Sequence, residues 1–278
     1  MSTEKIEEVR DFWNNNPLFM GESEHEVGSK QFFVHHKTVY IEDCFANNLD
    51  EEIFMPPSSK GKKILDLGCG VGFWTVEIQQ RKPGSQFFNA DLTENALKTT
   101  EKRLKIYSLE SNSSIQNAEK TTFEDNFFDH VNCQGVIHHT PNTEKCVEEI
   151  SRILKKGGTA YISVYYKNLF LRHWSKISIL GKALTKLGGG MKGRGRENIF
   201  SSKNTNDIVK LYDGDKNPIG KAYSKNEFLE MVENYFEVKR TDLFFFPARA
   251  LPFLLPKWLH QFLAKHFGFM IHVQLVKK

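Results

Sequence analysis

The chain has 278 residues, which suffices for one large α/β core with additions or for two small domains. Its composition, 40% hydrophobic and 26% charged, is ordinary for a globular protein, and a net charge of +4 is too small to indicate nucleic-acid binding without a clustered basic face. Four scattered cysteines without a C-x-x-C pair argue against a disulfide framework or zinc site, and neither a signal peptide nor a membrane-spanning run is evident, so a reducing cytoplasm is the expected location.

Residues 1–60 precede the first clear strand, and we expect them to form a helical cap instead of a separate domain. Apolar residues recur at helical spacing from Ile6 to Trp13, and Pro17 limits that helix. A second helix is expected from Phe45 to Phe54, ended by two prolines.

Strands and helices then alternate through residue 166, with short links between them. The expected strands are 64–67, 87–91, 115–118, 128–133 and 159–165. The expected helices are 73–81, one capped by Thr93 that runs through Leu104, and one opened by Thr143 that ends at Gly157-Gly158. Such alternation predicts a parallel sheet with helices on both faces.

The regular alternation of strands and helices ends after residue 166. An apolar stripe from Phe170 to Leu187, with lysines opposite, predicts one amphipathic helix, and residues 188–198 read as a basic, glycine-rich loop. Beyond a polar tract with a turn at 212–215, the expected elements are a helix opened by the capping box Ser224-x-x-Glu227, a strand at 236–246, a proline-broken helical segment at 247–268 and a strand at 269–276.

The most informative stretch runs from Lys63 to Thr75. A short apolar strand breaks into Gly68-Cys69-Gly70-Val71-Gly72, and a helical pattern follows at once. Glycines suit a turn where backbone approaches a ligand, and the helix points unpaired N–H groups at that turn. The dinucleotide-binding motif G-x-G-x-x-G has its third glycine three residues after the second. This chain has Phe73 at that position, so an NAD-binding dehydrogenase is disfavoured. The spacing, together with Asp66, favours a ligand with a cationic or amino group.

This stretch resembles motif I of the class I S-adenosylmethionine-dependent methyltransferases, and the similarity covers about residues 60–166. It extends to Phe128-Asp129-x-Val131 and to residues 153–158. The resemblance implies S-adenosyl-L-methionine as cofactor and a Rossmann-like, seven-stranded, mostly parallel sheet whose final strand is antiparallel. On this basis we expect a cap at 1–60 and one methyltransferase domain at 61–278, with a lid insertion around 167–222.

The resemblance also implies which residues contact the cofactor. Asp91, at the end of the second strand, would accept hydrogen bonds from both ribose hydroxyls. Gln134 would lie at the methionine moiety, with Asp66 near its amino group, and Asn117 stands where the family usually has an acidic residue near the adenine. The full expected set is Asp66, Gly68, Cys69, Gly70, Gly72, Asp91, Leu92, Asn117, Ala118 and Gln134.

His138 and His139 are the candidate acid/base residues. Methyl transfer needs alignment of donor and nucleophile, and an imidazole of near-neutral pKa helps when the nucleophile is a hydroxyl. The alternative is that one histidine packs in the core while the other hydrogen-bonds a loop carbonyl. No metal site is expected.

The expected reaction is methyl transfer to an oxygen, or less favourably a nitrogen, of a small, partly apolar molecule, because aromatic residues are abundant in the cap and lid. Two other functions stay open: an RNA methyltransferase, for which the loop at 192–196 is the one basic cluster, and a non-catalytic scaffold. The helix at 169–187 and the apolar segment at 243–267 could touch a membrane, although packing as a lid is the preferred interpretation. The sequence makes no prediction of oligomeric state.

Overall fold

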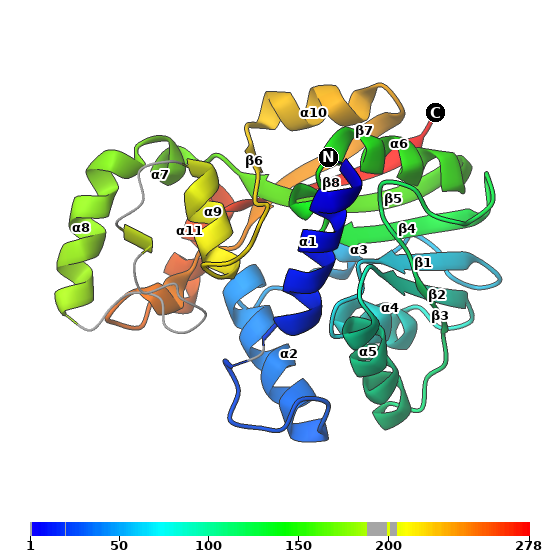
Figure 1. Ribbon diagram of the computed structural model, residues 1–278, viewed down its shortest axis with the longest axis horizontal. Coiled ribbons are helices and arrows are strands. Elements are labelled where there is room, and N and C mark those ends of the chain that lie inside the picture. The colour runs from blue at the N-terminus through cyan, green and yellow to red at the C-terminus, as the bar shows by residue number, and fades with distance from the viewer. Residues whose placement is uncertain (1, 20, 188–198, 201–204) are drawn as a thin grey trace.

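The computed structural model describes residues 2–19, 21–187, 199–200 and 205–278, so the basic loop expected at 188–198, with its cluster at 192–196, lies outside the described residues. A mixed sheet of order β3-β2-β1-β4-β5-β8-β7 forms its centre (Figure 1), and a short strand, β6, pairs with β5 off this path. The strands are β1 Lys63–Leu67, β2 Gln86–Asp91, β3 Asn112–Ile115, β4 Phe128–Gln134, β5 Leu154–Tyr166, β6 Ala222–Tyr223, β7 Phe236–Phe244 and β8 Met270–Lys277.

The strand directions confirm the expected α/β, Rossmann-like class. β1 to β5 are mutually parallel, whereas the last strand, β8, runs antiparallel to both of its neighbours, β5 and β7. The strand count is close to the predicted seven, with the two-residue β6 as the addition. The carboxyl ends of β1, β2 and β4 therefore meet at one edge of the sheet, where ligands bind in folds of this kind.

Helices cover both faces of the sheet (Figure 1). They are α1 Ser2–Asn15, α2 Lys30–Phe45, α3 Glu51–Phe54, α4 Phe73–Arg81, α5 Glu94–Ile106, α6 Thr143–Ile153, α7 Leu169–Arg172, α8 Trp174–Lys186, α9 Thr205–Asp213, α10 Lys225–Glu233 and α11 Lys257–Phe267. Alternation along β1 sends Ile64 into an aromatic cluster with α2, α3 and α4, while Leu65 and Leu67 join the larger core under α6 and α10.

Several expected boundaries are wrong. β3 begins three residues earlier than expected, because this exposed, polar edge strand offers no hydrophobic pattern. The helix expected from Phe45 to Phe54 is interrupted where Ala46 and Asn47 adopt left-handed backbone conformations, and only α3 remains of it. α6 ends at Ile153 and not at Gly157-Gly158, which belong to β5.

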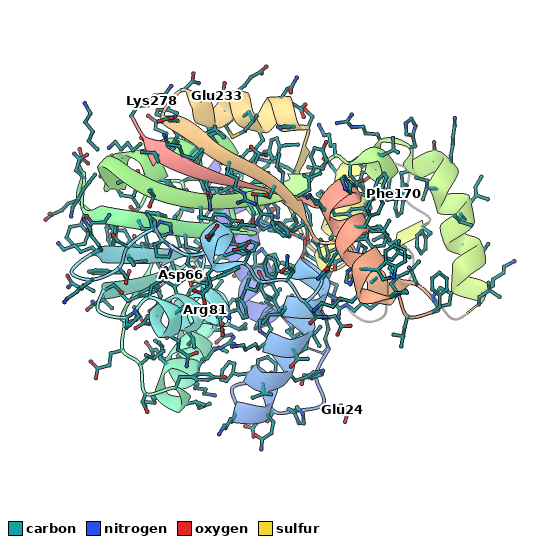
Figure 2. All side chains as sticks on the ribbon, turned by 180° about the vertical axis from the view of Figure 1, so that it is seen from behind. Glu24, Asp66, Arg81, Phe170, Glu233 and Lys278 are labelled. Atoms are coloured by element: carbon teal, nitrogen blue, oxygen red, sulfur yellow. The ribbon has the colours of Figure 1, made fainter. Side chains whose placement is uncertain are left out.

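The C-terminal third also differs from expectation. The single helix expected from Phe170 to Leu187 is split at His173 into α7 and α8, and α9 forms in a tract expected to be irregular. The capping box at Ser224 and Glu227 is confirmed. The helices α7, α8, α9 and α11 make a lobe beside the sheet, and Phe170 lies in it while Asp66 lies at the sheet (Figure 2). The division into a cap at 1–60 and a lid at 167–222 stays a prediction.

Among the described residues, no helix combines the length and apolar character needed to cross a membrane. All four cysteines are free thiols; Cys69, Cys133 and Cys146 are buried and Cys44 is half-buried.

Candidate functional site

A cavity of about 270 Å³ opens at the carboxyl ends of β1, β2 and β4. Its wall on the sheet side comes from the glycine turn after β1, the end of β2, the loop after β3 and the loop after β4. Its opposite wall comes from α1, α2 and the segment around residues 245–249. The cavity is thus placed where the glycine motif predicts a ligand, and segments far apart in sequence enclose it.

The glycine turn needs glycine for two different reasons. Gly68 and Gly70 both have positive φ angles, +79° and +53°. A methyl group added at Gly68 would lie 2.3 Å from Val136 Cγ2, whereas one added at Gly70 would meet no protein atom within 4 Å. Both residues line the cavity, so the space at Gly70 is space that a ligand can approach.

We therefore expect alanine to reduce mainly stability at Gly68 and mainly ligand binding at Gly70. Gly68→Ala should lower the free energy of unfolding by about 3 kcal/mol, because a clash adds to the left-handed backbone strain. Gly70→Ala should cost only about 1 kcal/mol of stability yet weaken S-adenosylmethionine binding at least ~10-fold. Chemical denaturation and calorimetry of both variants test this, and Gly68→Ala combined with Val136→Ala should recover part of the lost stability. Equal losses of stability in the two single variants would contradict it.

Asp91 closes β2 at the cavity wall and organises both neighbouring turns. Its Oδ2 accepts a hydrogen bond from the Gly70 backbone N–H at 3.0 Å. Its Oδ1 accepts from the Thr93 backbone N–H at 2.9 Å and from the Thr93 hydroxyl at 3.0 Å. Burial raises the pKa of the carboxyl group, and these hydrogen bonds oppose that rise.

Asp66 lies behind the cavity wall and acts through two other side chains. Its carboxylate accepts from the Thr75 hydroxyl at 2.6 Å and from Asn132 Nδ2 at 2.8 Å. Asn132 Oδ1 in turn accepts from Gln134 Nε2 at 2.7 Å. This chain fixes the amide of Gln134, whose Oε1 is buried, lines the cavity region and has no protein partner. This oxygen can therefore accept a hydrogen bond from a donor group on a ligand.

Burial raises the pKa of Asp66 to about 6, despite its two hydrogen bonds. The folded state then holds this proton more tightly than the unfolded state, so this group stabilises the fold at low pH, and its contribution is lost as the pH rises from about 4 to about 6.

We expect Asp66→Asn to remove that dependence, because an amide can accept from Asn132 and donate to Thr75 Oγ1. Between pH 4 and 6, the free energy of unfolding of the wild type should fall by about 2–3 kcal/mol relative to that of the variant. Urea denaturation at a series of pH values measures the difference. Parallel curves for the two proteins would contradict the raised pKa.

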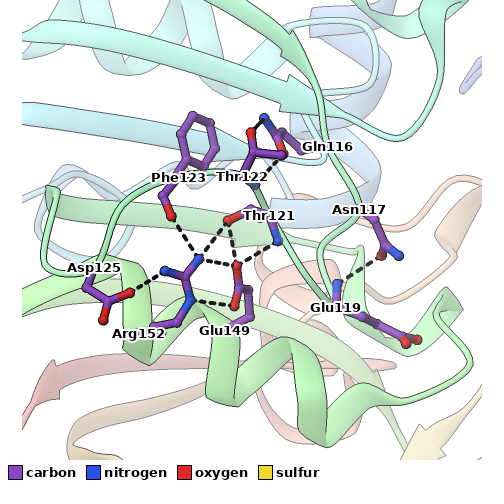
Figure 3. Close-up of polar contacts among 9 residues, drawn as sticks. All are labelled: Gln116, Asn117, Glu119, Thr121, Thr122, Phe123, Asp125, Glu149 and Arg152. Atoms are coloured by element: carbon purple, nitrogen blue, oxygen red, sulfur yellow. Dashed lines mark hydrogen bonds and ion pairs between the residues drawn. The ribbon is translucent and has the colours of Figure 1, made fainter.

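The loop after β3 carries Asn117 and Ala118 and is held by a charged network (Figure 3). Arg152 donates to both carboxylate oxygens of Glu149, at 2.8 and 2.7 Å, and to the Phe123 carbonyl at 2.9 Å. Glu149 also accepts from the backbone N–H and hydroxyl of Thr121, both at 2.6 Å. α6 thereby anchors a loop that has little secondary structure of its own.

Asn117 itself takes part in the turn of this loop, because its Oδ1 accepts from the Glu119 backbone N–H at 2.9 Å (Figure 3). One lone pair of that oxygen remains for a ligand. Gln116, which the sequence analysis did not single out, also lines the cavity.

The two histidines lie side by side, with ring centroids 4.2 Å apart, but their surroundings differ. His139 Nδ1 donates to the Ile219 carbonyl at 2.8 Å, and its Nε2 lies 3.4 Å from Asp213. His138 is 1% exposed and packs against Tyr165, with ring centroids 4.5 Å apart and the rings tilted by 59°. Its ring hydrogen-bonds the Ser163 carbonyl, whereas Nδ1 has no protein partner.

These surroundings determine the protonation state and the tautomer of the His138 ring. Burial, His139 and Lys221 hold the pKa of His138 well below its ordinary value, so the imidazole is neutral at pH 7. Because the ring N–H is used by the Ser163 carbonyl, Nδ1 carries the lone pair, and a neutral imidazole nitrogen of this kind can accept a proton from a ligand.

The cavity wall opposite the sheet is largely aromatic and carries one bridging cation. Arg249 lies 2.8 Å from Glu22 and also contacts Asp43. Trp13 packs edge-on against His139, with ring centroids 5.1 Å apart. The other aromatic residues of this wall are Phe19, Tyr40, Phe45, Tyr212 and Phe245, and Tyr165 of β5 adds an aromatic ring on the sheet side.

The structure brings most of the predicted site residues to one cavity. Gly68, Gly70, Asp91, Leu92, Asn117, Ala118, Gln134, His138 and His139 line it. Asp66, Cys69 and Gly72 do not: Asp66 acts through Asn132, Cys69 points at Asn89 and Thr100, and Gly72 opens α4. Asn132 was not among the predicted residues, because it is one of four polar residues in β4, and only its complete burial and its bond to Asp66 set it apart. No cluster of candidate metal ligands occurs in the described ranges.

Comparison with known proteins gives one family match. The model of the family described as "Methyltransferase domain" matches residues 65–162. This segment holds the glycine turn, Asp91, Gln134 and both histidines, and it stops before the C-terminal lobe.

Two relatives and one solved structure illustrate the similarity. A demethylmenaquinone methyltransferase from Geobacillus stearothermophilus is 34% identical over 101 residues, 36% of this chain and 43% of that protein. A ubiquinone biosynthesis O-methyltransferase from Azoarcus sp. (strain BH72) is 32% identical over 109 residues, 39% of this chain and 46% of the relative. The chain thus spans less than half the length of these relatives. A SAM-dependent methyltransferase structure from Methanosarcina mazei superposes with a TM-score of 0.54 at 18% identity, covering 79% of this chain and 93% of the other, which shows a shared fold.

Proposed function

From the premise that this chain carries a class I S-adenosylmethionine-dependent methyltransferase domain, we propose that it transfers a methyl group to a hydroxyl oxygen of a small, partly apolar molecule. The observation that carries the proposal is the unpartnered Nδ1 of His138, which lies at the same cavity as the glycine turn and the aromatic wall.

The polar groups at the sheet side of the cavity suit the proposed cofactor. Asp91 offers carboxylate oxygens for ribose hydroxyls, and Gln116, Asn117 and Ala118 offer hydrogen-bonding groups for the adenine. The unpartnered Oε1 of Gln134 can accept from the ammonium of the methionine moiety. Gly70 leaves room for the ligand to approach the backbone.

Bound S-adenosylmethionine supplies an electrophilic methyl group on a sulfonium sulfur. His138 Nδ1 takes the proton of the acceptor hydroxyl as the new carbon–oxygen bond forms. His138 would then carry one positive charge as an imidazolium, so the total charge of the site would be unchanged by the transfer. His139 and Asp213 hold the neighbouring ring and Tyr165 in place, since Asp213 accepts from the Tyr165 hydroxyl at 3.1 Å.

The aromatic wall and the relatives together favour a hydroxylated ring as the acceptor. Seven phenylalanine, tyrosine and tryptophan side chains line the same cavity as His138, which suits a flat, apolar body with a polar substituent. One relative is named as an O-methyltransferase of ubiquinone biosynthesis and another as a demethylmenaquinone methyltransferase. These names support a quinone-like or phenolic acceptor over an RNA.

Calorimetry with S-adenosylhomocysteine, followed by methyl-transfer assays on matched ring compounds, tests the proposal. Each compound is supplied with a hydroxyl, an amino or a methoxy group at one position. We expect binding of the cofactor product and transfer only to the hydroxyl compounds. Transfer confined to the amino compounds would move the acceptor to nitrogen, and binding without any transfer would favour a non-catalytic scaffold.

A further inference from the structure

The exposed hydrophobic side chains of the described residues gather in two stretches of the C-terminal lobe. Eight of the eleven large apolar residues that are more than a third exposed lie at 169–187 or at 253–262. They are Leu169, Ile179, Leu180, Leu187, Phe253, Leu254, Trp258 and Phe262. Scattered single residues of this kind are ordinary, but a concentration in one lobe marks an interaction surface.

The geometry of α11 shows why its apolar residues face outward. His260 and Ala264 are buried, and His260 Nε2 bonds the Phe246 carbonyl at 2.9 Å. The opposite side of the helix carries Trp258 and Phe262, one turn apart, which are 69% and 51% exposed. Just before the helix, Leu254 is 95% exposed. The helix is thus fixed on the protein by one face and exposes the apolar side chains of the other.

The charged side chains of these two stretches are all basic. Residues 243–278 contain no aspartate or glutamate, and neither do residues 167–196. Lys257 and Lys265 flank the exposed face of α11, while Lys176, Lys182 and Lys186 accompany the exposed residues of α8. Exposed apolar stretches that carry cations and have no acids of their own complement the surface of an anionic phospholipid bilayer.

We propose that the surface formed by Phe253, Leu254, Trp258 and Phe262 docks the protein on anionic membranes. Leu254 and the Trp258 ring enter the boundary between headgroups and acyl chains, and Lys257 and Lys265 contact lipid phosphates. A second copy of this chain is a poorer occupant, because two such surfaces would bring their cations together without an acidic partner.

The docking surface follows the cavity wall closely in the sequence. Phe245 and Arg249 line the cavity, and Leu254 follows only five residues after Arg249. A bilayer in contact with Leu254 would therefore lie beside the part of the cavity where the acceptor is expected. This link rests on the proposed function, whereas membrane docking itself stands on the exposed residues and their charge.

Vesicle flotation with the whole chain tests the docking. Vesicles of phosphatidylcholine mixed with an equal part of phosphatidylglycerol should carry the wild type upward, and vesicles of phosphatidylcholine alone should carry at least ~10-fold less. The double variant Leu254→Ser/Trp258→Ser should lose at least ~10-fold in binding, because the area it would bury is then polar. The control Val34→Ser/Ile115→Ser changes side chains that are 51% and 55% exposed elsewhere, and it should bind like the wild type.

Tryptophan fluorescence gives a second readout from one position. Of the four tryptophans, Trp74 and Trp174 are buried, Trp13 is half-buried at the cavity and Trp258 is 69% exposed, so a blue shift on adding anionic vesicles reports chiefly on Trp258. Trp258→Phe should abolish the shift, and the variant should still float with anionic vesicles.

Binding that is equal for both vesicle types, or unchanged in Leu254→Ser/Trp258→Ser, would overturn the proposal. Loss of a dimer in that variant, without vesicle binding by the wild type, would assign the surface to a second copy instead. Calorimetry with S-adenosylhomocysteine is independent of these outcomes and tests the proposed function separately.

Discussion

Asp91→Ala is expected to weaken S-adenosylmethionine binding at least ~100-fold, because two hydrogen bonds from ribose hydroxyls to a carboxylate contribute about 1.5–3 kcal/mol each. The variant also frees the Gly70 N–H and the Thr93 N–H, both of which Asp91 holds. Loss of the ligand contacts therefore coincides with loosening of the turn that receives the ligand. Calorimetric titration with the cofactor or with S-adenosylhomocysteine measures the effect.

The stability of the ligand-free protein separates a binding effect from unfolding. Asp91→Ala should lower the melting temperature by a few degrees, because the Gly70 and Thr93 N–H groups lose their acceptor, while the increase in melting temperature on adding the cofactor should disappear. Glu94→Ala is the matched control, because this exposed acid lies three residues further on and pairs with Lys98 at 3.0 Å on the helix surface. Retention of tight binding in Asp91→Ala, or an equal loss in Glu94→Ala, would contradict the assignment of Asp91.

The central part of the fold could be predicted because its signals are local. β1, the glycine turn and α4 follow one another within nineteen residues of sequence, and each has its own hydrophobic period or conformational requirement. β3 could not be placed correctly, because Asn112–Ile115 is an edge strand held by pairing to β2 and not by buried apolar side chains. α9 was missed for a similar reason: Ile208 and Val209 are buried in a cluster whose other members include residues of α7, α8, β5 and β6.

The candidate site likewise has one part that local sequence signals predict and one part that they do not. The cofactor side was predictable because parallel strands bring Gly68, Asp91 and Gln134 to one edge. The acceptor side depends on contacts between segments more than 200 residues apart, such as Arg249 with Glu22 and Asp43, for which the sequence has no local signal. Which histidine faces the cavity with a free nitrogen was likewise undetermined, since it depends on Ser163 and Ile219 as partners.

His138→Gln is expected to lower kcat by about 10²–10⁴-fold, the usual contribution of a general base, with little change in cofactor affinity. Above pH 6.5 the wild-type rate should not vary with pH, and it should fall only in more acidic solution, because the pKa of His138 is held well below its ordinary value by burial, His139 and Lys221. In the variant the acceptor must lose its proton to solvent. Its rate should therefore rise with pH toward the pKa of the acceptor hydroxyl, about 10 for an ordinary phenol.

A comparison of acceptors then distinguishes a base from a packing residue. With a ring compound whose hydroxyl is strongly acidic, the acceptor is already ionised at pH 7, and His138→Gln should reduce kcat far less than it does with an ordinary phenol. His139→Gln is the matched control: it breaks the bond to the Ile219 carbonyl, so it should lower stability and reduce kcat to the same extent for both acceptors. If His138→Gln also reduced kcat equally for both acceptors and showed no recovery at high pH, His138 would serve only to pack against Tyr165, and methyl transfer here would depend on alignment alone.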